Sequence, residues 1–410
     1  MNTSLSQPMI RFGDPLIISR GPFSIDRKIY PDDTLISRKF PSTLASTVDY
    51  LDFIEKYVPE DLISQNNFSQ LKNLAGNFSG GLTSYFGFES RLGSSEAKVD
   101  FSFAVSSKRG EREALVNLIT KNNLPDTFYM HPEWQQLSNF TLVWMDPNSI
   151  LHDKVLGVWF EFDEDSFFET SVPCVFINTI PIKTCSINTI SQYSWLTDVA
   201  IPPLIGHRLS KKMEEQLFDC IQKMPPRTSI FQVGTMLSRS TYGLRLVINR
   251  IRSNQIIPYL KSIGWSDESE GLSSFIEELE KYVTRFVLHI HINGKVDPKI
   301  GVECSFYSGS GGRKKDWSDF LSYLVEKGLC LPEKQNSLLH FTGVELEDIT
   351  NDYNLDSLIP SVKLPDDGYS RASVRFISHI KIVYQPGHPL EAKAYLGVRE
   401  YGIPNNGGNY

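Results

Sequence analysis

The feature of this 410-residue chain that most limits its fold is a pairing of short alternating segments that occurs five times. Within each segment apolar and polar residues alternate, which is typical of strands with one face on a core and one face toward polar surroundings. A short connection joins the two segments of each pair, which predicts a hairpin. The pairs lie near residues 83–105, 156–178, 229–249, 284–306 and 374–398.

Segments with the helical spacing of apolar residues separate the hairpins. They lie at 42–58, 60–76, 110–123, 131–146, 210–224, 254–265, 271–283, 316–328 and 331–343. The chain therefore consists of about five helix–helix–strand–strand units, which repeat in structure without repeating in sequence.

An antiparallel sheet of ten strands with helices on its apolar side can stay open or close into a barrel. Closure removes the two edge strands of an open sheet and turns the polar faces inward. Ten strands enclose more space than side chains alone fill, so closure implies a ligand cavity. We expect an α/β barrel, a ten-stranded antiparallel β-barrel of five ααββ repeats with helices outside. It occupies residues 42–400, after an N-terminal extension at 1–41 and before a flexible tail at 401–410.

Composition and charge exclude several classes of partner. The net charge of −7 provides no basic field for nucleic acid. No apolar run is long enough to cross a membrane, and the N-terminus lacks the pattern of a secretory signal. The five cysteines form no CxxC pair, which fits reduced thiols. We expect a cytoplasmic protein with no nucleic-acid or membrane partner.

Candidate functional residues lie on the polar faces of the expected strands. A carboxylate inside a drier lumen can have its pKa raised toward neutrality and serve as a general acid or base. The candidate catalytic residues are Glu89, Asp100, Glu161 and Glu303. The candidate substrate-binding residues are Trp159, Gln232, Arg245, His289, His291, His379, Lys381, Lys393 and Tyr395. In the alternative interpretation the carboxylates only form ion pairs with the lysines and Arg245.

Two histidines two residues apart raise the possibility of a metal site. His289 and His291 share a face with Glu303 on the next expected strand, and these residue types suit Zn²⁺ or Fe²⁺. Alternating histidines are also found on ordinary polar strand faces. We expect no metal.

The repeat and its end hairpins resemble the ABBA-type (PT-barrel) aromatic prenyltransferases, whose fold is a barrel of five such units. The stretch "GGLTSYFGFESRLGSSEAKVDFSFAVS" looks like the first hairpin of the indole-type members. The stretches "HIKIVYQ" and "KAYLGV" are similar to the family's Lys-x-Tyr strands. The likeness in topology covers roughly residues 42–400, and the likeness in motifs covers its two ends.

This resemblance implies transfer of a prenyl group from an isoprenyl diphosphate to an aromatic acceptor, which is an indole, a phenol or a peptide side chain. It implies no required metal or other cofactor, because basic residues neutralise the diphosphate. Glu89 matches the family's acceptor-binding glutamate. Arg245, Lys381, Lys393 and Tyr395 lie on strands that carry donor-binding residues in the family.

The chain departs from the family pattern at Asp100, where the family usually has an arginine. The expected lumen holds more carboxylates than cations, and an acidic lumen suits a cationic ligand better than a polyanion. Two alternatives therefore stay open. One is a barrel of the same ancestry that performs cofactor-free acid/base chemistry (an isomerase, epimerase or cyclase) on a peptide or cationic substrate. The other is a non-catalytic barrel that binds peptides.

Overall fold

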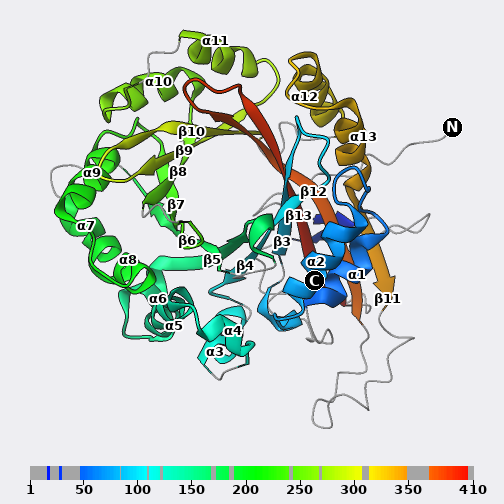
Figure 1. The fold of residues 1–410 in the computed structure, drawn as a ribbon, viewed down its shortest axis with the longest axis horizontal. Helices are drawn as coiled ribbons and strands as arrows, with labels where there is room; N and C mark the ends of the chain where they lie inside the picture. Colours follow the sequence, from blue (N-terminus) through cyan, green and yellow to red (C-terminus); the bar gives the residue numbers. More distant parts are fainter. Residues whose placement is uncertain are drawn as a thin grey trace.

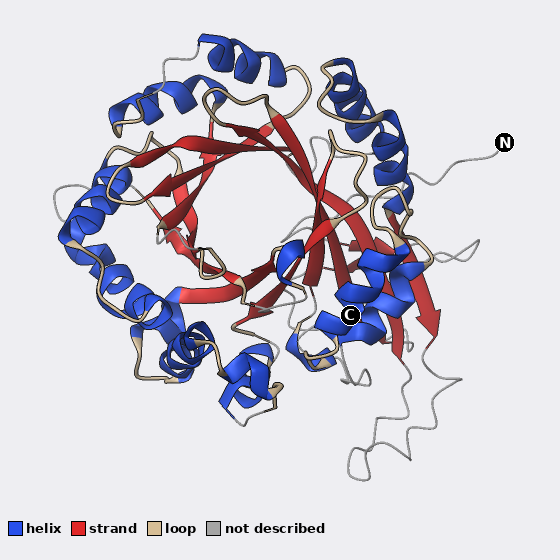
Figure 2. Ribbon diagram, viewed as in Figure 1, coloured by secondary structure: helices blue, strands red, loops and turns tan. Residues whose placement is uncertain are grey.

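Ten antiparallel strands close into a barrel, and the helices form a layer around it (Figures 1 and 2). The structure is a computed structural model. It describes residues 16–18, 27–29, 47–83, 85–108, 110–120, 123–167, 172–183, 189–239, 243–266, 270–306, 314–348 and 369–404. The prediction of a closed barrel of helix–helix–strand–strand units is confirmed.

The barrel strands occur as five consecutive hairpins at the positions that the alternating pattern predicts. They are β3 (Tyr85–Arg91), β4 (Val99–Ser106), β5 (Val155–Phe162), β6 (Cys174–Ile182), β7 (Ser229–Thr235), β8 (Leu244–Ile251), β9 (Arg285–Ile292), β10 (Val296–Ser305), β12 (Tyr369–Tyr384) and β13 (Glu391–Pro404). Each pairs with its neighbour in the chain or, for β3 with β13 and β10 with β12, with a strand far away in sequence.

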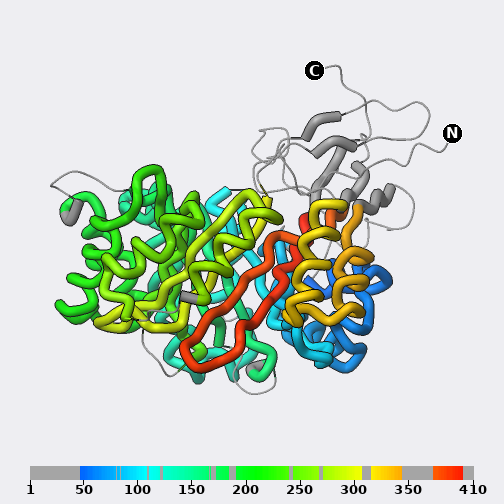
Figure 3. The backbone as a smooth tube through the Cα atoms, turned by 90° about the horizontal axis from the view of Figure 1, so that it is seen from above, coloured from blue at the N-terminus to red at the C-terminus, as the bar shows by residue number. Residues whose placement is uncertain are grey.

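The pairing of β10 with β12 closes the barrel. The C-terminal half of β12 pairs with β10, and its N-terminal half pairs with an additional strand, β11 (Gly343–Asp348). Seen from above, the β12–β13 hairpin runs beside α12 and α13 (Figure 3). The strand β13 runs to Pro404, and residues 405–410 of the expected tail lie outside the described residues. In the expected N-terminal extension, β1 (Leu16–Ile18) pairs with β2 (Arg27–Ile29).

Helices precede each hairpin. They are α1 (Thr47–Glu55), α2 (Gln65–Ala75), α3 (Glu111–Thr120), α4 (Asp126–Tyr129), α5 (Pro132–Met145), α6 (Ile150–Lys154), α7 (Thr189–Trp195), α8 (Ile201–Ile205), α9 (Lys211–Gln222), α10 (Ser253–Ser262), α11 (Glu270–Leu279), α12 (Lys314–Glu326) and α13 (Pro332–Phe341). The sequence predicted one helix before the third hairpin, whereas α7 and α8 precede α9. Two consecutive prolines near the start of α8 conceal its helical pattern, although proline is tolerated in a first helical turn. Within the described residues, no helix has both the length and the apolarity that a membrane crossing needs.

The hydrophobic core lies between the barrel and the helices. Phe103 of β4 is 1% exposed and packs against Phe78 at 4.9 Å and Phe160 at 5.1 Å between ring centroids. Neighbouring strands repeat this arrangement, since every second residue points outward into the core. Their polar alternates consequently point into the lumen.

The strand β6 completes the predicted alternation, and the strand β7 departs from it. The faces of β6, which the sequence left open, place Val175 and Ile177 against core residues of the adjacent strands. In β7 strict alternation would place Phe231 on the core face together with Val233, and the strand departs from it. A register shift between Ile230 and Gln232 gives that core position to Ile230, because a bulge adds one residue to the strand.

Truncation of Phe103 to alanine tests the core. We expect Phe103→Ala to lower the free energy of unfolding by about 3–5 kcal/mol, because it leaves a cavity among packed rings. The matched control is Leu142→Ala, at a side chain that is 49% exposed; a change there should stay within about 0.5 kcal/mol. Both are measured by chemical denaturation, and equal losses in the two variants would contradict this placement of the core.

Candidate active site

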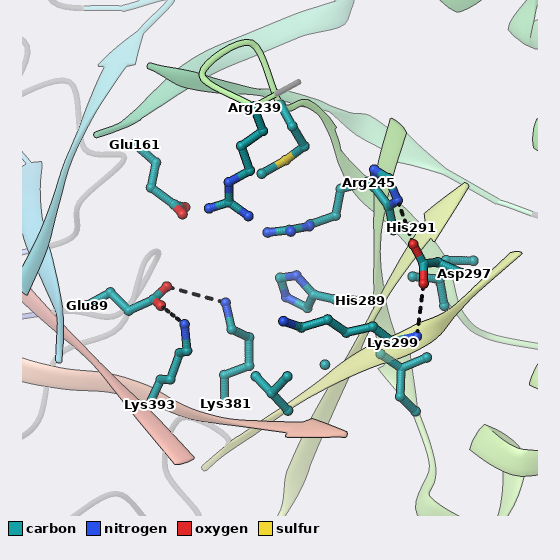
Figure 4. A pocket seen from close by; sticks show the side chains of 15 residues that line it. Glu89, Glu161, Arg239, Arg245, His289, His291, Asp297, Lys299, Lys381 and Lys393 are labelled. Carbon is teal, nitrogen blue, oxygen red and sulfur yellow. Dashed lines mark hydrogen bonds and ion pairs between the residues drawn. The ribbon is translucent and has the colours of Figure 1, made fainter. Parts of the chain in front are cut away.

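The lumen contains a cavity of about 200 Å³ that is lined mainly by charged and polar side chains (Figure 4). It brings together seven of the residues predicted from the sequence: Glu89, Glu161, Arg245, His289, His291, Lys381 and Lys393. Its other lining residues are Met236, Arg239, Ile290, Asp297, Lys299, Ile300, Gly301 and Val383. These residues come from both halves of the chain, and closure of the sheet places them around one space.

Glu89 lies at the centre of a hydrogen-bonded group of basic and phenolic side chains. The carboxylate is 5% exposed, and Lys393 Nζ lies 2.7 Å and Lys381 Nζ 3.4 Å from its two oxygens. Lys381 donates to the Tyr395 hydroxyl, which in turn donates to Glu89. Burial alone would raise the pKa of Glu89, but the charges of Lys381 and Lys393 hold it well below its ordinary value. Both oxygens of the Glu89 carboxylate therefore already accept hydrogen bonds from Lys381, Lys393 and Tyr395.

Two further cations, Arg239 and Lys299, line the cavity, and neither was predicted from the sequence. Arg239 follows β7 in a turn, and Lys299 lies where the β9–β10 register shifts between Val296 and Ile300. Alternation cannot assign a face to a residue in a turn or a bulge. The guanidinium groups of Arg239 and Arg245 and the ammonium of Lys299 all point into the cavity (Figure 4).

The charge balance of the cavity differs from the acidic lumen that the sequence suggested. Its lining contains three carboxylates, Glu89, Glu161 and Asp297, against five lysine and arginine side chains. These five are Arg239, Arg245, Lys299, Lys381 and Lys393. Cations from several elements around one space form an anion site. The lining is less acidic than the sequence suggested for two reasons. The basic residues Arg239 and Lys299 were not predicted, and the carboxylates of Asp100 and Glu303 are not part of the lining.

Glu161 is the cavity carboxylate with the most freedom to act on a ligand. It is half-buried on β5, and within the described part of the chain no hydrogen bond to its carboxylate is present. Burial, followed by the charge of Glu89, raises its pKa, and the effects of Lys381 and Arg245 do not cancel this. A carboxylate of this kind can accept a hydrogen bond or a proton from a bound molecule.

Glu303 holds a pair of neutral histidines beside the cavity: His289 belongs to the cavity lining, and His379 does not. His289 Nε2 lies 2.5 Å and His379 Nε2 3.4 Å from the same Glu303 oxygen. Burial lowers the pKa of both histidines, that of His379 to about 4, so their imidazoles are neutral near pH 7. The ring of His379 stacks on that of Tyr395 with centroids 4.2 Å apart. Among the described residues, no three His, Cys, Asp or Glu side chains are placed to hold a metal ion.

The architecture was compared with known proteins. No family model and no curated protein matches the sequence. Among solved structures, the apo form of the prenyltransferase PriB aligns with a TM-score of 0.50 at 10% identity, over 85% of this chain and 94% of PriB. The chain has the PT-barrel fold. 5-Dimethylallyltryptophan synthase from Streptomyces coelicolor gives a TM-score of 0.49 at 8% identity, over 86% of this chain and 97% of its own. AnaPT from Neosartorya fischeri gives 0.45 at 12%, over 92% and 97%.

The remaining predicted site residues lie in the PT-barrel wall outside the cavity lining. Asp100, predicted to be catalytic, accepts a hydrogen bond from the backbone N–H of Glu164 at 2.9 Å and lies 3.5 Å from Arg91. Burial and the charge of Glu89 raise the pKa of Asp100 to about 7. Gln232 donates to the Asn178 side chain at 2.8 Å. These contacts connect neighbouring strands of the barrel.

Trp159, which was also predicted to bind substrate, belongs to an aromatic group on the inner face of the barrel. Its ring meets that of Tyr85 edge-on at 4.8 Å, and Tyr85 lies 5.9 Å from Phe376. Phe176 packs over Gly234, where any side chain would collide with its ring. The lumen thus combines a cationic cavity with an aromatic lining.

The pH dependence of stability tests the charge of Glu89. Because the pKa of Glu89 is lower in the folded chain than its ordinary value of 4.5, its ion pairs stabilise the fold above pH 4.5. That stabilisation is lost as the pH falls through the folded-state pKa. We therefore expect Glu89→Gln to unfold at a lower temperature than wild type near neutral pH, with the difference narrowing below pH 4.5.

Thermal melts over this pH range measure the effect. Glu215→Gln, at an exposed glutamate on α9, is the control and should give no pH-dependent difference. A Glu89→Gln difference that stays constant with pH would contradict the ion-paired carboxylate.

Proposed function

We propose that this PT-barrel transfers a prenyl group from an isoprenyl diphosphate to an aromatic acceptor. The observation that carries the proposal is the convergence of five basic side chains on one lumen cavity, in a fold that PriB, a prenyltransferase, shares. A diphosphate is a compact polyanion, and lysine and arginine are the residues that bind phosphate groups. The acceptor is an indole, a phenol or an aromatic side chain of a peptide.

The proposed reaction needs stabilisation of the leaving group. The bond between the prenyl carbon and the diphosphate oxygen breaks, a bond from that carbon to the acceptor forms, and the acceptor loses a proton. Negative charge grows on the diphosphate as it leaves, and preorganised cations such as Arg245 and Lys381 stabilise it. Because the chain itself supplies these charges, the proposal requires no metal ion or organic cofactor.

Aromatic side chains of the lumen suit the carbon part of the reaction. The rings of Tyr85, Trp159 and Phe376 form one group on the inner face of the barrel. Aromatic faces attract a developing carbocation and exclude water that would otherwise trap it. Trp159 is two residues from Glu161 on the same strand, so both project to the same side.

We assign acceptor orientation and proton acceptance to Glu161 in place of Glu89. Lys381, Lys393 and Tyr395 occupy the Glu89 carboxylate, whereas the carboxylate of Glu161 faces the cavity. Its raised pKa brings it closer to the range in which a carboxylate exchanges protons near neutral pH. Acid/base chemistry without a donor would also use Glu161, but a cationic substrate does not suit a cavity with excess positive charge.

Product analysis tests the proposal directly. The protein is incubated with isoprenyl diphosphates of increasing length and a panel of indoles, tyrosine derivatives and peptides. The masses of the products are then measured by mass spectrometry. We expect a mass gain of one prenyl unit. Arg245→Ala should raise the KM for the diphosphate about tenfold or more, since a charge-assisted contact is lost. Lys261→Ala, at an exposed lysine on α10, is the control. Activity on a substrate without diphosphate that survives Arg245→Ala would instead support acid/base chemistry.

The pH profile of kcat tests the role of Glu161. Because the raised pKa leaves Glu161 protonated at acidic pH, activity should rise with pH through a midpoint above 4.5. Glu161→Gln should lower kcat by about 10²–10⁴-fold and remove the decrease of kcat at acidic pH. The comparison variant is Asp100→Asn, because the Asp100 carboxyl also has a raised pKa but lies outside the cavity lining. The assignment of proton acceptance to Glu161 would be overturned if the decrease of kcat at acidic pH disappeared in Asp100→Asn and persisted in Glu161→Gln.

A further inference from the structure

The turn after β7 is tied to the end of β5 by a single carboxylate. Asp163 directly follows β5, and its Oδ1 accepts a hydrogen bond from Arg239 Nη2 at 2.7 Å. Its Oδ2 accepts from Arg239 Nε at 3.2 Å and from the Ser238 hydroxyl at 3.1 Å. Two consecutive residues of the turn, Ser238 and Arg239, are thus held by one aspartate that lies 75 and 76 positions earlier in the chain.

Asp163 is itself held in place by its neighbour in the chain. The backbone N–H of Glu164 donates to Asp100 Oδ1 at 2.9 Å, and the Glu164 carboxylate lies 3.1 Å from Lys98 Nζ. Asp100 and Lys98 belong to the β4 side of the first hairpin. The Asp163 carboxylate therefore projects from a segment that the barrel wall keeps in position.

The geometry of the Arg239 pair leaves part of the guanidinium free for a ligand. An arginine has five N–H donors in a planar fork. Asp163 engages the edge formed by Nε and Nη2, so among the described residues the Nη1 edge keeps its donors. Arg239 lines the cavity, and its guanidinium points into it on the side of Glu161 (Figure 4). The ion pair with Asp163 thus orients Arg239 without covering its Nη1 edge.

We propose that Asp163, together with Ser238, is a positioning residue that holds Arg239 ready to bind a phosphate group in the cavity. The inference rests on the proposed function in its choice of a diphosphate as the ligand. A long side chain that is already fixed loses less conformational freedom when the ligand arrives, so affinity rises without a new contact. Asp163 acts through Arg239 and does not touch the ligand.

Binding of inorganic pyrophosphate to the full chain, measured by calorimetry, tests the inference without any need for turnover. We expect Arg239→Ala to weaken binding about tenfold or more, since it removes a charge-assisted contact. Asp163→Asn should weaken it about three- to tenfold, because the arginine is no longer held in its fork. The double variant Asp163→Asn/Arg239→Ala should bind as weakly as Arg239→Ala alone. Asp219→Asn, whose carboxylate pairs with Lys223 on the surface of α9, is the matched control and should bind like wild type.

The double-variant cycle separates positioning from a general effect on the fold. If Asp163→Asn weakens binding by the same factor with and without Arg239, or has no effect at all, the inference is overturned. If the cycle behaves as expected but no prenylated product forms, prenyl transfer fails while the positioning role stands. If wild type binds no pyrophosphate, both are overturned.

Discussion

Closure of the sheet between β10 and β12 is the constraint on which the site depends. In that pairing Glu303 lies opposite Lys381, although the two residues are far apart in the chain. If the sheet stayed open, its polar face would be solvated and its lysines and glutamates would be ordinary surface residues. Closure removes the edges and encloses the polar faces. Closure therefore pairs the backbone hydrogen-bonding groups of the edge strands and also creates a cavity lined by charged side chains.

Enclosing charge has an energetic cost that shapes the rest of the lumen. A charged group taken out of water must find partners or lose its charge. Both solutions are present: Glu89 keeps its charge because Lys381 and Lys393 flank it, while burial makes His289 and His379 neutral. The arrangement concentrates the unmatched positive charge on the Arg245 and Lys299 side of the cavity.

Sequence reasoning recovered what depends on alternation and missed what depends on irregular backbone. The inner positions of Glu161, Arg245 and Lys381 follow from a period of two, which holds in the part of each strand around these residues. Arg239 lies in a turn and Lys299 beside a shift in register, where the period fails. The ion pairs of Glu89 with Lys381 and Lys393 were one of two interpretations that the sequence left open, because a choice between them requires knowing which strands become neighbours on closure. Asp100 shares the inner face with Glu89, yet contacts at the strand end, which no pattern encodes, place it in the wall.

Two of the three carboxylates that line the cavity, Glu89 and Glu161, have opposite electrostatic environments. Glu89 and Glu161 are both buried from bulk water to a large degree, yet their pKa values move in opposite directions. Burial raises the pKa of both groups, and their neighbours make the difference: two lysines and a tyrosine stabilise the charge on Glu89, and that charge further disfavours ionisation of Glu161. Pairs of titratable groups whose environments push their pKa values apart mark the division between a fixed charge and a proton acceptor. In the function proposed above, Glu89 therefore carries a fixed charge and Glu161 is the carboxylate that accepts the proton.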